Sequence, residues 1–399
     1  LVPDEKWNLS PAVLKTLQRR LLFERDNPLS LLKQRIVSFM YSKFQVKGGL
    51  SPMFAVVDNQ PRVVSVFENF DSLLVPWDHV SRSDLDTYYV NKDHCLRAHT
   101  SAHQHSLIKQ GLDNFLVIGD VYRRDAIDRT HFPCFHQVEG VRLFTATELF
   151  GDPDKLAILQ KTLLTNGLRT AEGQEQHAGD VTQLLTKDLK ETLENLCGHI
   201  FGSEHKLRWV SAEFPFTHPS FELEMYYDNK WMEVLGCGVI EQNLLKMAGI
   251  VDRVGWAFGL GLERLAMILY EIPDIRLFWS RDSGFLSQFA GKSPNDDIKY
   301  VPVSVHPQIL YDLSFWLPEG ISPEAMVAET YDLIRSLGGE LIEQVKVTDT
   351  YMHPKTMRRS QTYRLVYRSH SGTLTKEDVN PIHSLIREKL VESFGVTLR

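Results

Sequence analysis

Residues 117–140, VIGDVYRRDAIDRTHFPCFHQVEG, place chemically capable side chains around a loop between two strand-like runs. The first run ends in the adjacent arginines Arg123 and Arg124, and a polar loop follows it. On the second run Gln137 and Glu139 are two residues apart, so both side chains share one face of a strand. Ordinary surface charges and a solvated sheet face would also explain these residues. Evidence for what these residues bind therefore has to come from other parts of the sequence.

Four pairs of residues two apart lie on predicted strands or at their ends, which would place both members of each pair on one face. The pairs are His99/Ser101, Arg123/Asp125, Gln137/Glu139 and Phe214/Phe216. Ser101 has a second interpretation, because SAHQ has the pattern of a capping box that opens a helix at Ala102. Core packing is the simplest explanation of the two phenylalanines. No pair identifies a site by itself.

A glycine-rich stretch at residues 255–267, GWAFGLGLERLAM, precedes an apolar helix. It lacks the third glycine and the later acidic residue of a dinucleotide-binding fingerprint, and the chain has no GxxxxGK[ST] phosphate loop. The glycines would instead allow Arg264, in the first turn of the helix, to lie against a flat ligand. A planar guanidinium stacks on an aromatic ring and can also reach phosphate oxygens.

The composition of the 399-residue chain is globular, with 43% hydrophobic residues, 24% charged residues and a formal net charge of −7. This charge excludes binding of polyanions by bulk charge, so any contact with nucleic acid has to come from local patches. The four cysteines have no finger-like spacing, which favours reduced thiols over a structural zinc site. No apolar run has the length of a membrane span. The opening LVPDEKWNLS has no leader pattern, which is consistent with a removed targeting segment or a trimmed terminus.

The order of predicted elements indicates an α+β protein. Residues 1–48 form a helical N-terminal segment whose basic residues would lie on a solvated face. Residues 49–270 mix short β runs in hairpin order with helices, which favours an antiparallel sheet flanked by helices. Residues 271–303, with Pro273, Pro294 and the polar GKSPNDD, form a connector.

Residues 304–399 follow the order β-α-β-β-α-β of a ferredoxin-like domain. Ser322 and Pro323 are typical of a helix start, and Gly338 with Gly339 would end that helix. Two strands flank a turn at residues 353–354. The spacing in 375–378 resembles a capping box for the second helix, and a glycine at 395 would end it.

Taken together, these residues resemble a known family. VYRRD…FHQVEG resembles motif 2, and GLGLERLAM motif 3, of the class II aminoacyl-tRNA synthetases. ENFDSLLVPWDHVSR, DTYYVN, LRAHTSAHQ and FPFTHPSFE are similar to the phenylalanine enzymes of that class. The C-terminal domain is similar to the anticodon-binding domain of their single-chain mitochondrial form. The resemblance covers nearly all of the chain after residue 28, and its motifs are ordered and mutually spaced.

The resemblance implies an ATP site on the arginine arm of the hairpin and on the glycine-rich stretch. Arg123 would bind the α-phosphate and His131 the triphosphate tail. Phe135 and Arg264 would enclose adenine between them, and Asp125 would lie near the nucleotide. Attack of a carboxylate on the α-phosphorus needs positive charge and rigid alignment but no protein nucleophile. Arg123 and Arg264 are therefore the expected catalytic residues.

The resemblance also implies a phenylalanine site. The ammonium and carboxylate groups of the amino acid would be bound by four polar residues, namely His99, Ser101, Gln137 and Glu139. Phe214 and Phe216 would contact the ring of the substrate edge to face, with Ala257 at the pocket floor.

Two departures from the family pattern affect these expectations. This chain has His218 where bacterial relatives tend to have a glutamate associated with magnesium. We therefore expect Mg²⁺ to arrive with ATP and assign it no protein ligand. The Gly-Pro of motif 1, which supports the class II dimer, is not evident in PMFAVVDNQPRVVSVFENF, so a monomer is expected.

The C-terminal hairpin is basic although the whole chain is acidic. Lysines and arginines crowd residues 346–368 against the single acid Asp349, and a solvated hairpin is the alternative explanation. The expected contacts to tRNA(Phe) are four residues: Lys355, Arg358, Arg359 and Arg364. The implied location is the mitochondrial matrix.

The sequence thus predicts a phenylalanine–tRNA ligase that forms phenylalanyl-adenylate from ATP and transfers it to the 3′-terminal adenosine of tRNA(Phe). One rival is an inactive paralogue that serves as an RNA-binding module, which loss of Arg123, Arg264 or the Gln/Glu pair would favour. All of these residues are present. The second rival is an adenylating ligase of the biotin or lipoate kind, against which the anticodon-type domain argues.

Overall fold

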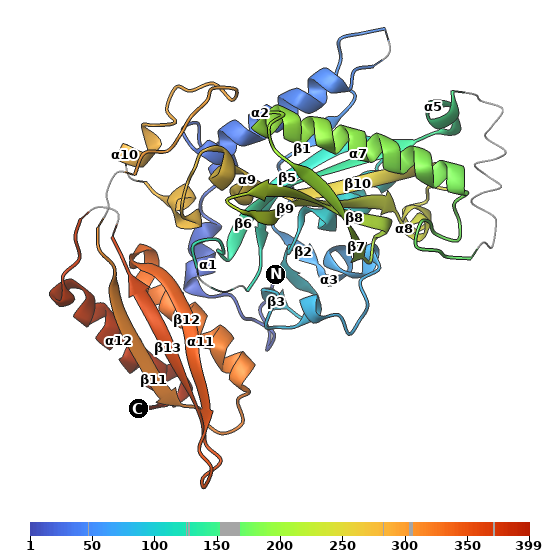
Figure 1. The fold of residues 1–399 in the computed structure, drawn as a ribbon. Coiled ribbons are helices and arrows are strands. Elements are labelled where there is room, and N and C mark those ends of the chain that lie inside the picture. Colours follow the sequence, from blue (N-terminus) through green and yellow to red (C-terminus); the bar gives the residue numbers. More distant parts are fainter. Residues whose placement is uncertain are drawn as a thin grey trace.

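The computed structural model describes residues 1–46, 48–124, 126, 128–151, 168–281, 283–302, 306–369 and 372–399. Figure 1 shows a larger body built on a seven-stranded sheet and a smaller C-terminal body built on four strands. Among the described residues, no helix is both long and apolar enough to cross a membrane.

The seven-stranded sheet has the order β1-β5-β6-β10-β9-β8-β7. The strands are β1 Ala55–Val57, β5 Asn114–Tyr122, β6 Cys134–Phe144, β7 Leu207–Phe214, β8 Thr217–Tyr227, β9 Lys230–Ile240 and β10 Val254–Gly261. All neighbours are antiparallel except β1 and β5, which pair in parallel. The expected antiparallel sheet is therefore present, with one parallel strand added at its edge. A small sheet of β2 Val63–Ser65, β4 His94–Leu96 and β3 Tyr89–Asn91 lies apart from it.

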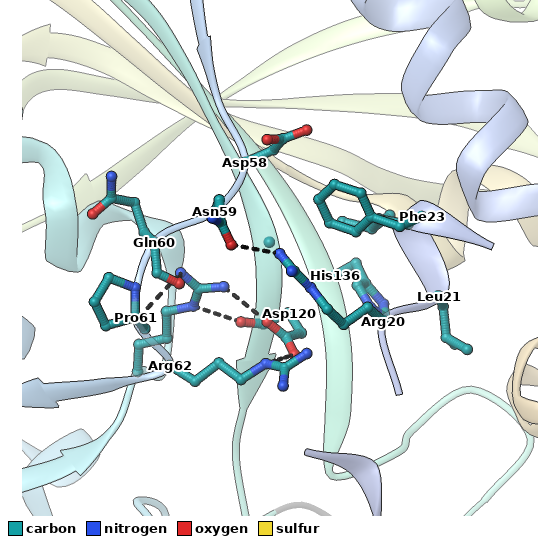
Figure 2. Close-up of a pocket in the computed structure, with 13 residues that line it drawn as sticks. Arg20, Leu21, Phe23, Asp58, Asn59, Gln60, Pro61, Arg62, Asp120 and His136 are labelled. Carbon is teal, nitrogen blue, oxygen red and sulfur yellow. Dashed lines mark hydrogen bonds and ion pairs between the residues drawn. The ribbon is translucent and has the colours of Figure 1, made fainter. Parts of the chain in front are cut away.

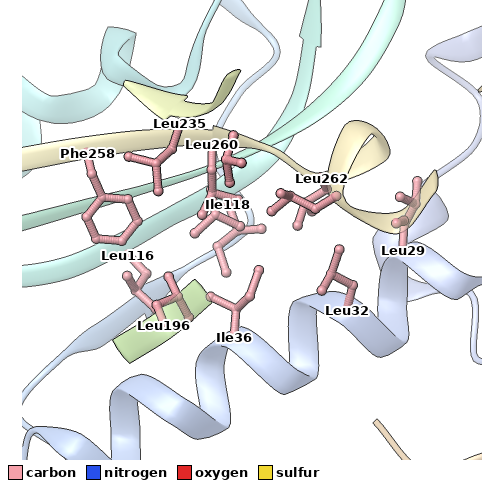
Figure 3. Packing of buried hydrophobic residues seen from close by; sticks show 14 of the residues in the cluster. Leu29, Leu32, Ile36, Leu116, Ile118, Leu196, Leu235, Phe258, Leu260 and Leu262 are labelled. Carbon is pink, nitrogen blue, oxygen red and sulfur yellow. The ribbon is translucent and has the colours of Figure 1, made fainter. Parts of the chain in front are cut away.

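Long helices cover one face of the large sheet: α2 Pro28–Lys43, α7 Gly179–Phe201 and α9 Leu262–Leu269. Figure 3 shows Leu32 and Ile36 of α2 packed toward Leu116 and Ile118 of β5. Successive residues of a strand point to opposite faces of the sheet. Phe115 and Val117 of β5 therefore belong to a second hydrophobic cluster, on the face opposite the long helices. Gln137 and Glu139 of β6 pair with Gly119 and Val117 of β5 and lie on this second face.

The remaining helical elements of the larger body are short. They are α1 Pro11–Thr16, α3 Val66–Asn69, α4 Gln104–Lys109, α5 Ala146–Phe150, α8 Gln242–Met247 and α10 Ser283–Leu286, with 3₁₀ turns at Leu21–Phe23, Asp71–Leu73, Val80–Arg82, Thr100–His103 and Ile275–Trp279. Their packing overturns part of one expectation about the N-terminal segment. Lys33 and Arg35 do not lie on a solvated face, because Lys33 pairs with Asp58 at 2.5 Å and Arg35 donates to the carbonyl of His199, whereas Arg20 is exposed as expected. One face of α2 packs into the core, and these two cations beside it have partners there.

The C-terminal body confirms the predicted order of elements. It consists of β11 Ile309–Trp316, α11 Pro323–Gly338, β12 Ile342–Met352, β13 Arg359–Tyr367, α12 Lys376–Phe394 and β14 Thr397–Leu398, with a 3₁₀ turn at Gly339–Leu341. The sheet order β12-β13-β11-β14 is the ferredoxin-like one. Ser322 caps α11, Thr375 and Asp378 form the capping box of α12, and Gly395 ends α12 with φ 63°.

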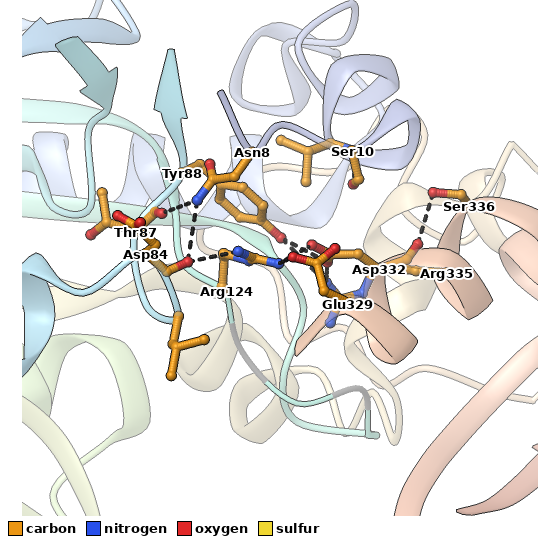
Figure 4. A network of polar contacts seen from close by, with 12 residues as sticks. Asn8, Ser10, Asp84, Thr87, Tyr88, Arg124, Glu329, Asp332, Arg335 and Ser336 are labelled. Atoms are coloured by element: carbon orange, nitrogen blue, oxygen red, sulfur yellow. Dashed lines mark hydrogen bonds and ion pairs between the residues drawn. The ribbon is translucent and has the colours of Figure 1, made fainter. Parts of the chain in front are cut away.

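Two arginines of the β5–β6 loop connect the bodies. Figure 4 shows Arg124 extended toward α11, where its Nη2 lies 2.9 Å from Asp332 Oδ2. Its Nη1 donates to the carbonyl oxygen of Asp84. Arg129 pairs with the buried Glu343 of β12 at 2.6 Å. The loop that carries Arg123 is therefore fixed to the ferredoxin-like domain at two points.

Candidate active site

A cavity of about 550 Å³ opens on the second face of the large sheet, a volume typical of a site for a small molecule. It is lined by eight of the residues that the sequence singles out: His99, Ser101, Arg123, Gln137, Glu139, Phe214, Phe216 and Ala257. These residues come from segments up to 158 positions apart in the chain (99 to 257). The fold therefore brings both predicted substrate-binding groups to one place.

Glu139 is the buried carboxylate at the polar end of the cavity. Its side chain is buried, its Oε2 accepts a hydrogen bond from Ser101 Oγ at 2.5 Å, and its Oε1 has no hydrogen-bond partner. Burial raises the pKa of Glu139 to about 7. A buried carboxylate with an unused oxygen favours a positively charged ligand, because such a ligand would restore the solvation that the carboxylate has lost.

Ser101 acts in this cluster and not as a helix cap. The 3₁₀ turn Thr100–His103 has His99 at its N-cap position with no side-chain cap bond, and α4 also begins without one. The hydroxyl of Ser101 instead donates to Glu139. The capping-box interpretation was therefore wrong, because the backbone enters the turn one residue before Ser101.

Two further polar groups complete this end of the cavity. Gln137 accepts a hydrogen bond from the backbone N–H of Thr100 at 3.3 Å. Burial lowers the pKa of His99 to about 3, so its ring is neutral, and its Nδ1 has no partner. The cavity thus presents two unpaired polar atoms, His99 Nδ1 and Glu139 Oε1, on residues that line it.

The other end of the cavity is apolar. The rings of Phe214 and Phe216 are stacked at a centroid distance of 6.0 Å and an interplanar angle of 13°, and Ala257 lies in β10 opposite Gly238. The sequence analysis missed Gly236, which also lines the cavity. A Cβ at Gly236 would lie 2.9 Å from Phe214 Cζ, so only glycine allows this ring to lie against the sheet. The signal was the paired glycines of VLGCGVI in a strand, where glycine often marks a close approach.

Cations mark the predicted nucleotide side. Arg123 lines the cavity, donates from Nε to the carbonyl of Ala98 at 2.9 Å, and holds its guanidinium 5.1 Å from the ring centroid of Phe135. Arg264 is half-exposed, and its Nη1 lies 3.4 Å from Glu233 Oε2 at the cavity wall. The structure therefore places both cations where an anion could reach them.

Two other predicted nucleotide residues have different outcomes. His131 pairs with Asp128 at 2.7 Å in the β5–β6 loop, and Asp125 lies outside the described residues. Arg124 also borders the cavity, but its guanidinium is already bound to Asp332. The two adjacent arginines therefore have different neighbours, since Arg124 is bound by Asp332 while the guanidinium of Arg123 lies beside the ring of Phe135.

A second cavity lies at the edge of β5 and is polar (Figure 2). Arg62 and Arg97 both pair with Asp120, at 2.5 and 2.8 Å. Arg62 also donates to the carbonyls of Leu17 and Arg19. Because these guanidinium groups already bind protein groups, we interpret them as links between chain segments. The cavity is not a candidate active site.

The predicted tRNA contacts on the C-terminal hairpin do not share one face. Arg364 pairs with Asp312 through two contacts of 2.8 Å on the face of the sheet away from the helices. Arg358 lies 5.4 Å from the ring centroid of Trp316. Arg359 lies on the same face of β13 as the buried Tyr363 and borders a groove beside the start of α11. Lys355 is exposed in the turn between the strands.

The described residues contain no group of three or more histidine, cysteine, aspartate or glutamate side chains arranged to bind a metal ion.

Comparison with known proteins agrees with this geometry. Residues 40–150 and 180–289 match the family of tRNA synthetases class II core domain (F), and residues 304–399 match the ferredoxin-fold anticodon binding domain. The chain is 48% identical to the mitochondrial phenylalanine–tRNA ligase of Mus musculus over 98% of its own length and 86% of that protein. It is 41% identical to the chloroplastic/mitochondrial enzyme of Arabidopsis thaliana, over 99% of this chain and 83% of that protein. With the mitochondrial enzyme of Saccharomyces cerevisiae the identity is 36%, over 98% of this chain and 92% of that protein. The chain belongs to the phenylalanine–tRNA ligase family of class II tRNA synthetases.

Proposed function

We propose that this protein is a mitochondrial phenylalanine–tRNA ligase that uses ATP. One observation carries the proposal: a single cavity joins a buried, partly unpaired polar cluster to an aromatic, apolar end. Glu139 and His99 would bind the ammonium group of an amino acid, while Phe214, Phe216 and Ala257 would enclose its ring. Phenylalanine is the amino acid that matches an ammonium site beside a wholly apolar aromatic pocket.

In the first reaction a carboxylate oxygen of phenylalanine attacks the α-phosphorus of ATP, and pyrophosphate leaves. Arg123 would stabilise the charge that develops on the α-phosphate, and Gln137 with Glu139 would fix the amino acid for attack. Phe135 and Arg264 would bind the two faces of adenine, His131 the triphosphate tail, and Asp125 would lie near the nucleotide. No protein nucleophile is needed.

In the second reaction a hydroxyl of the 3′-terminal ribose of tRNA(Phe) attacks the carbonyl carbon of the adenylate, and AMP leaves. The basic hairpin would bind the distal part of the tRNA. Arg358 and Arg364 support this role best, since both lie on the sheet face away from the helices or at its end. We propose Lys355 as a further contact and Arg359 as a weaker one, because it lies beside α11.

We further propose that Mg²⁺ binds with ATP through the phosphates, that the protein acts as a monomer in the mitochondrial matrix, and that the catalytic domain spans residues 49–270. On this division residues 1–48 are an N-terminal segment, 271–303 a connector and 304–399 the anticodon-binding domain. The names of the relatives support the mitochondrial location.

A pyrophosphate-exchange assay tests the proposal. Each of the twenty amino acids is supplied with ATP and labelled pyrophosphate, and we expect exchange with phenylalanine far above the others. Charging of tRNA(Phe) by the same preparation is the second measurement. Absence of phenylalanine-dependent exchange would leave an inactive paralogue, and exchange without charging would indicate an adenylating ligase of another kind.

A further inference from the structure

A buried carboxylate links β6 to α9 behind the proposed adenine site. Glu263, in the first turn of α9, accepts a hydrogen bond from the backbone N–H of His136 at 2.8 Å through Oε2. Its Oε1 lies 2.6 Å from Nδ1 of the same histidine. Both side chains are only 3% exposed. One side chain thus fixes both the backbone and the ring of a single strand residue.

The sequence neighbours of this Glu263–His136 pair are the two residues proposed to enclose adenine. Phe135 precedes His136, and Arg264 follows Glu263. Neighbouring residues of a strand point to opposite faces, so His136 faces the helices while Phe135 faces the cavity side. Arg264 reaches Glu233 at the cavity wall. The pair therefore joins the two chain segments that carry Phe135 and Arg264.

The backbone hydrogen bonds of the sheet do not extend as far as Phe135 and Arg264. The ladder between β6 and β10 ends at the pair Gln137 and Gly261, and α9 begins immediately afterwards. No ladder hydrogen bond joins the backbone of Phe135 to that of Arg264. The Glu263–His136 pair is a side-chain connection beyond the end of the ladder, and both of its side chains are buried, where hydrogen bonds are stronger than in water.

Aromatic rings packed around the Glu263–His136 pair restrict the orientation of the histidine ring. The ring of His136 lies 6.2 Å from that of Trp279, which in turn stacks on Phe132 at 5.5 Å. These contacts restrict the histidine ring but do not touch α9 at Glu263. Leu262, Leu265 and Ala266 also hold α9 in the core, and the carboxylate adds a polar link between this helix and β6.

We propose that Glu263 is a positioning residue for ATP: by binding His136 it sets the separation of the Phe135 ring and the Arg264 guanidinium, and so the affinity for adenine. This inference rests on the proposed function, and on adenine binding between those two residues. A carboxylate is suited to the task because it accepts two hydrogen bonds at once from the backbone N–H and the ring N–H.

The test measures the Michaelis constants for ATP and for phenylalanine in pyrophosphate exchange, together with inhibition by adenosine and the melting temperature. Glu263→Ala removes both bonds, whereas Glu263→Gln retains one acceptor and one donor in the same place. Leu265→Ala is the matched control, because Leu265 is buried on the same helix in the hydrophobic core and contributes no hydrogen bond to His136. Phe135→Ala tests the adenine site itself.

We expect Glu263→Ala to raise the KM for ATP and the inhibition constant of adenosine about tenfold, the scale of one lost positioning contact, with little change in the KM for phenylalanine. Glu263→Gln should stay within about threefold of wild type, because it can still form both hydrogen bonds. Leu265→Ala should lower the melting temperature and leave the ratio of the two KM values unchanged.

The inference is overturned if Glu263→Ala leaves that ratio at the wild-type value, or if Leu265→Ala changes it equally. Failure of the proposed adenine site has a different signature, namely that Phe135→Ala and Arg264→Ala leave the inhibition constant of adenosine unchanged. Absence of phenylalanine-dependent exchange in the wild type would be the failure of the proposed function.

Discussion

The amino-acid end of the cavity and the proposed nucleotide side differ in how deeply their charged groups are buried and in what binds those groups. At the amino-acid end Glu139 is buried and uses hydroxyl donors from Ser101 and Thr100, with one oxygen left unpaired. On the proposed nucleotide side, beyond the residues that line the cavity, Arg264 and His131 are about half-exposed, and each has an acidic partner in the protein, Glu233 and Asp128.

The difference follows from the charge of the two ligands. The carboxylate proposed to bind the ammonium group, that of Glu139, is already buried in the unliganded protein, and its raised pKa is the consequence of that burial. ATP is a large polyanion that could attract exposed cations without such preparation. The protein keeps those cations near acids, which ATP would have to displace. The amino-acid end is therefore preformed, and the nucleotide end is expected to rearrange on binding.

The largest effect should come from Arg123, where the two ends meet. Arg123→Ala should lower kcat for pyrophosphate exchange about 10²- to 10³-fold, because it removes the cation nearest the reacting phosphate. The dissociation constant for tRNA, measured in parallel, should be nearly unchanged. A loss smaller than about tenfold, worth roughly 1.4 kcal/mol of barrier, would contradict the role given to Arg123.

The preformed carboxylate predicts a pH dependence for phenylalanine binding. The ammonium group needs ionised Glu139, so the apparent affinity for phenylalanine should fall as pH drops through about 7, by up to about tenfold per unit. Glu139→Gln should weaken binding and remove this dependence. The measurement is the KM for phenylalanine from pH 5.5 to pH 8.5, about the range that spans the titration.

The same carboxylate should be a cost to stability in the unliganded protein. The pKa of Glu139 in the folded protein is above its ordinary value of 4.5, so its contribution to stability is complete below 4.5 and is lost as pH rises through about 7. Glu139→Gln should therefore raise the melting temperature at pH values above about 7 and change it little in acid. A lower melting temperature at high pH would indicate that the carboxylate stabilises the empty site.

Ala257 tests the apolar part of the preformed end. Ala257→Gly should admit para-substituted phenylalanines and raise tyrosine activation, while phenylalanine itself should lose about 1 kcal/mol or less of contact energy. The measurement is the ratio of kcat/KM for phenylalanine to that for para-chlorophenylalanine. We expect the ratio to fall about tenfold, the scale of discrimination for one methylene group. An unchanged ratio would place the methyl of Ala257 away from the para position.

A substitution on the C-terminal hairpin should affect neither end of the cavity. Arg358→Glu should raise the KM for tRNA about threefold or more at physiological salt and spare pyrophosphate exchange, because it removes a phosphate contact. The slope of binding against salt should flatten by roughly 0.7–0.9. Arg359→Glu is the matched control on the helix side of the sheet and should have the smaller effect. Equal effects would remove the distinction between the two faces.

The smallest effect should come from the acid that competes for Arg264. Glu233→Gln removes a partly exposed ion pair at 3.4 Å, a kind of contact worth at most about 1 kcal/mol. We expect the KM for ATP to fall about two- to threefold, with no change in the pH dependence of phenylalanine binding. A higher KM for ATP would instead show that Glu233 assists the nucleotide, and the contrast between the two ends would need revision.

Local chemistry in the sequence predicted much of this protein. The alternation of Gln137 and Glu139, the caps at Ser322 and Thr375 and the glycine stop at 395 all depend on residues within a few positions of one another. These predictions were confirmed because they depend on neighbouring residues alone, whereas the capping-box pattern at Ser101 did not form a cap, since Ser101 donates to the distant Glu139. The order of strands and helices likewise predicted the ferredoxin-like domain.

Tertiary structure decided which of several suitable partners each polar group binds. Arg123 and Arg124 are adjacent and chemically equal, yet only Arg124 turns to Asp332, 208 residues later. Glu263 and His136 are 127 residues apart and meet only because β10 pairs with β6. Burial of α2 gave Lys33 a partner that its sequence does not reveal. The charge and hydrogen-bonding capacity of each group are properties of the sequence. Burial exists only in the folded chain, and it determines how much free energy a polar group loses without a partner.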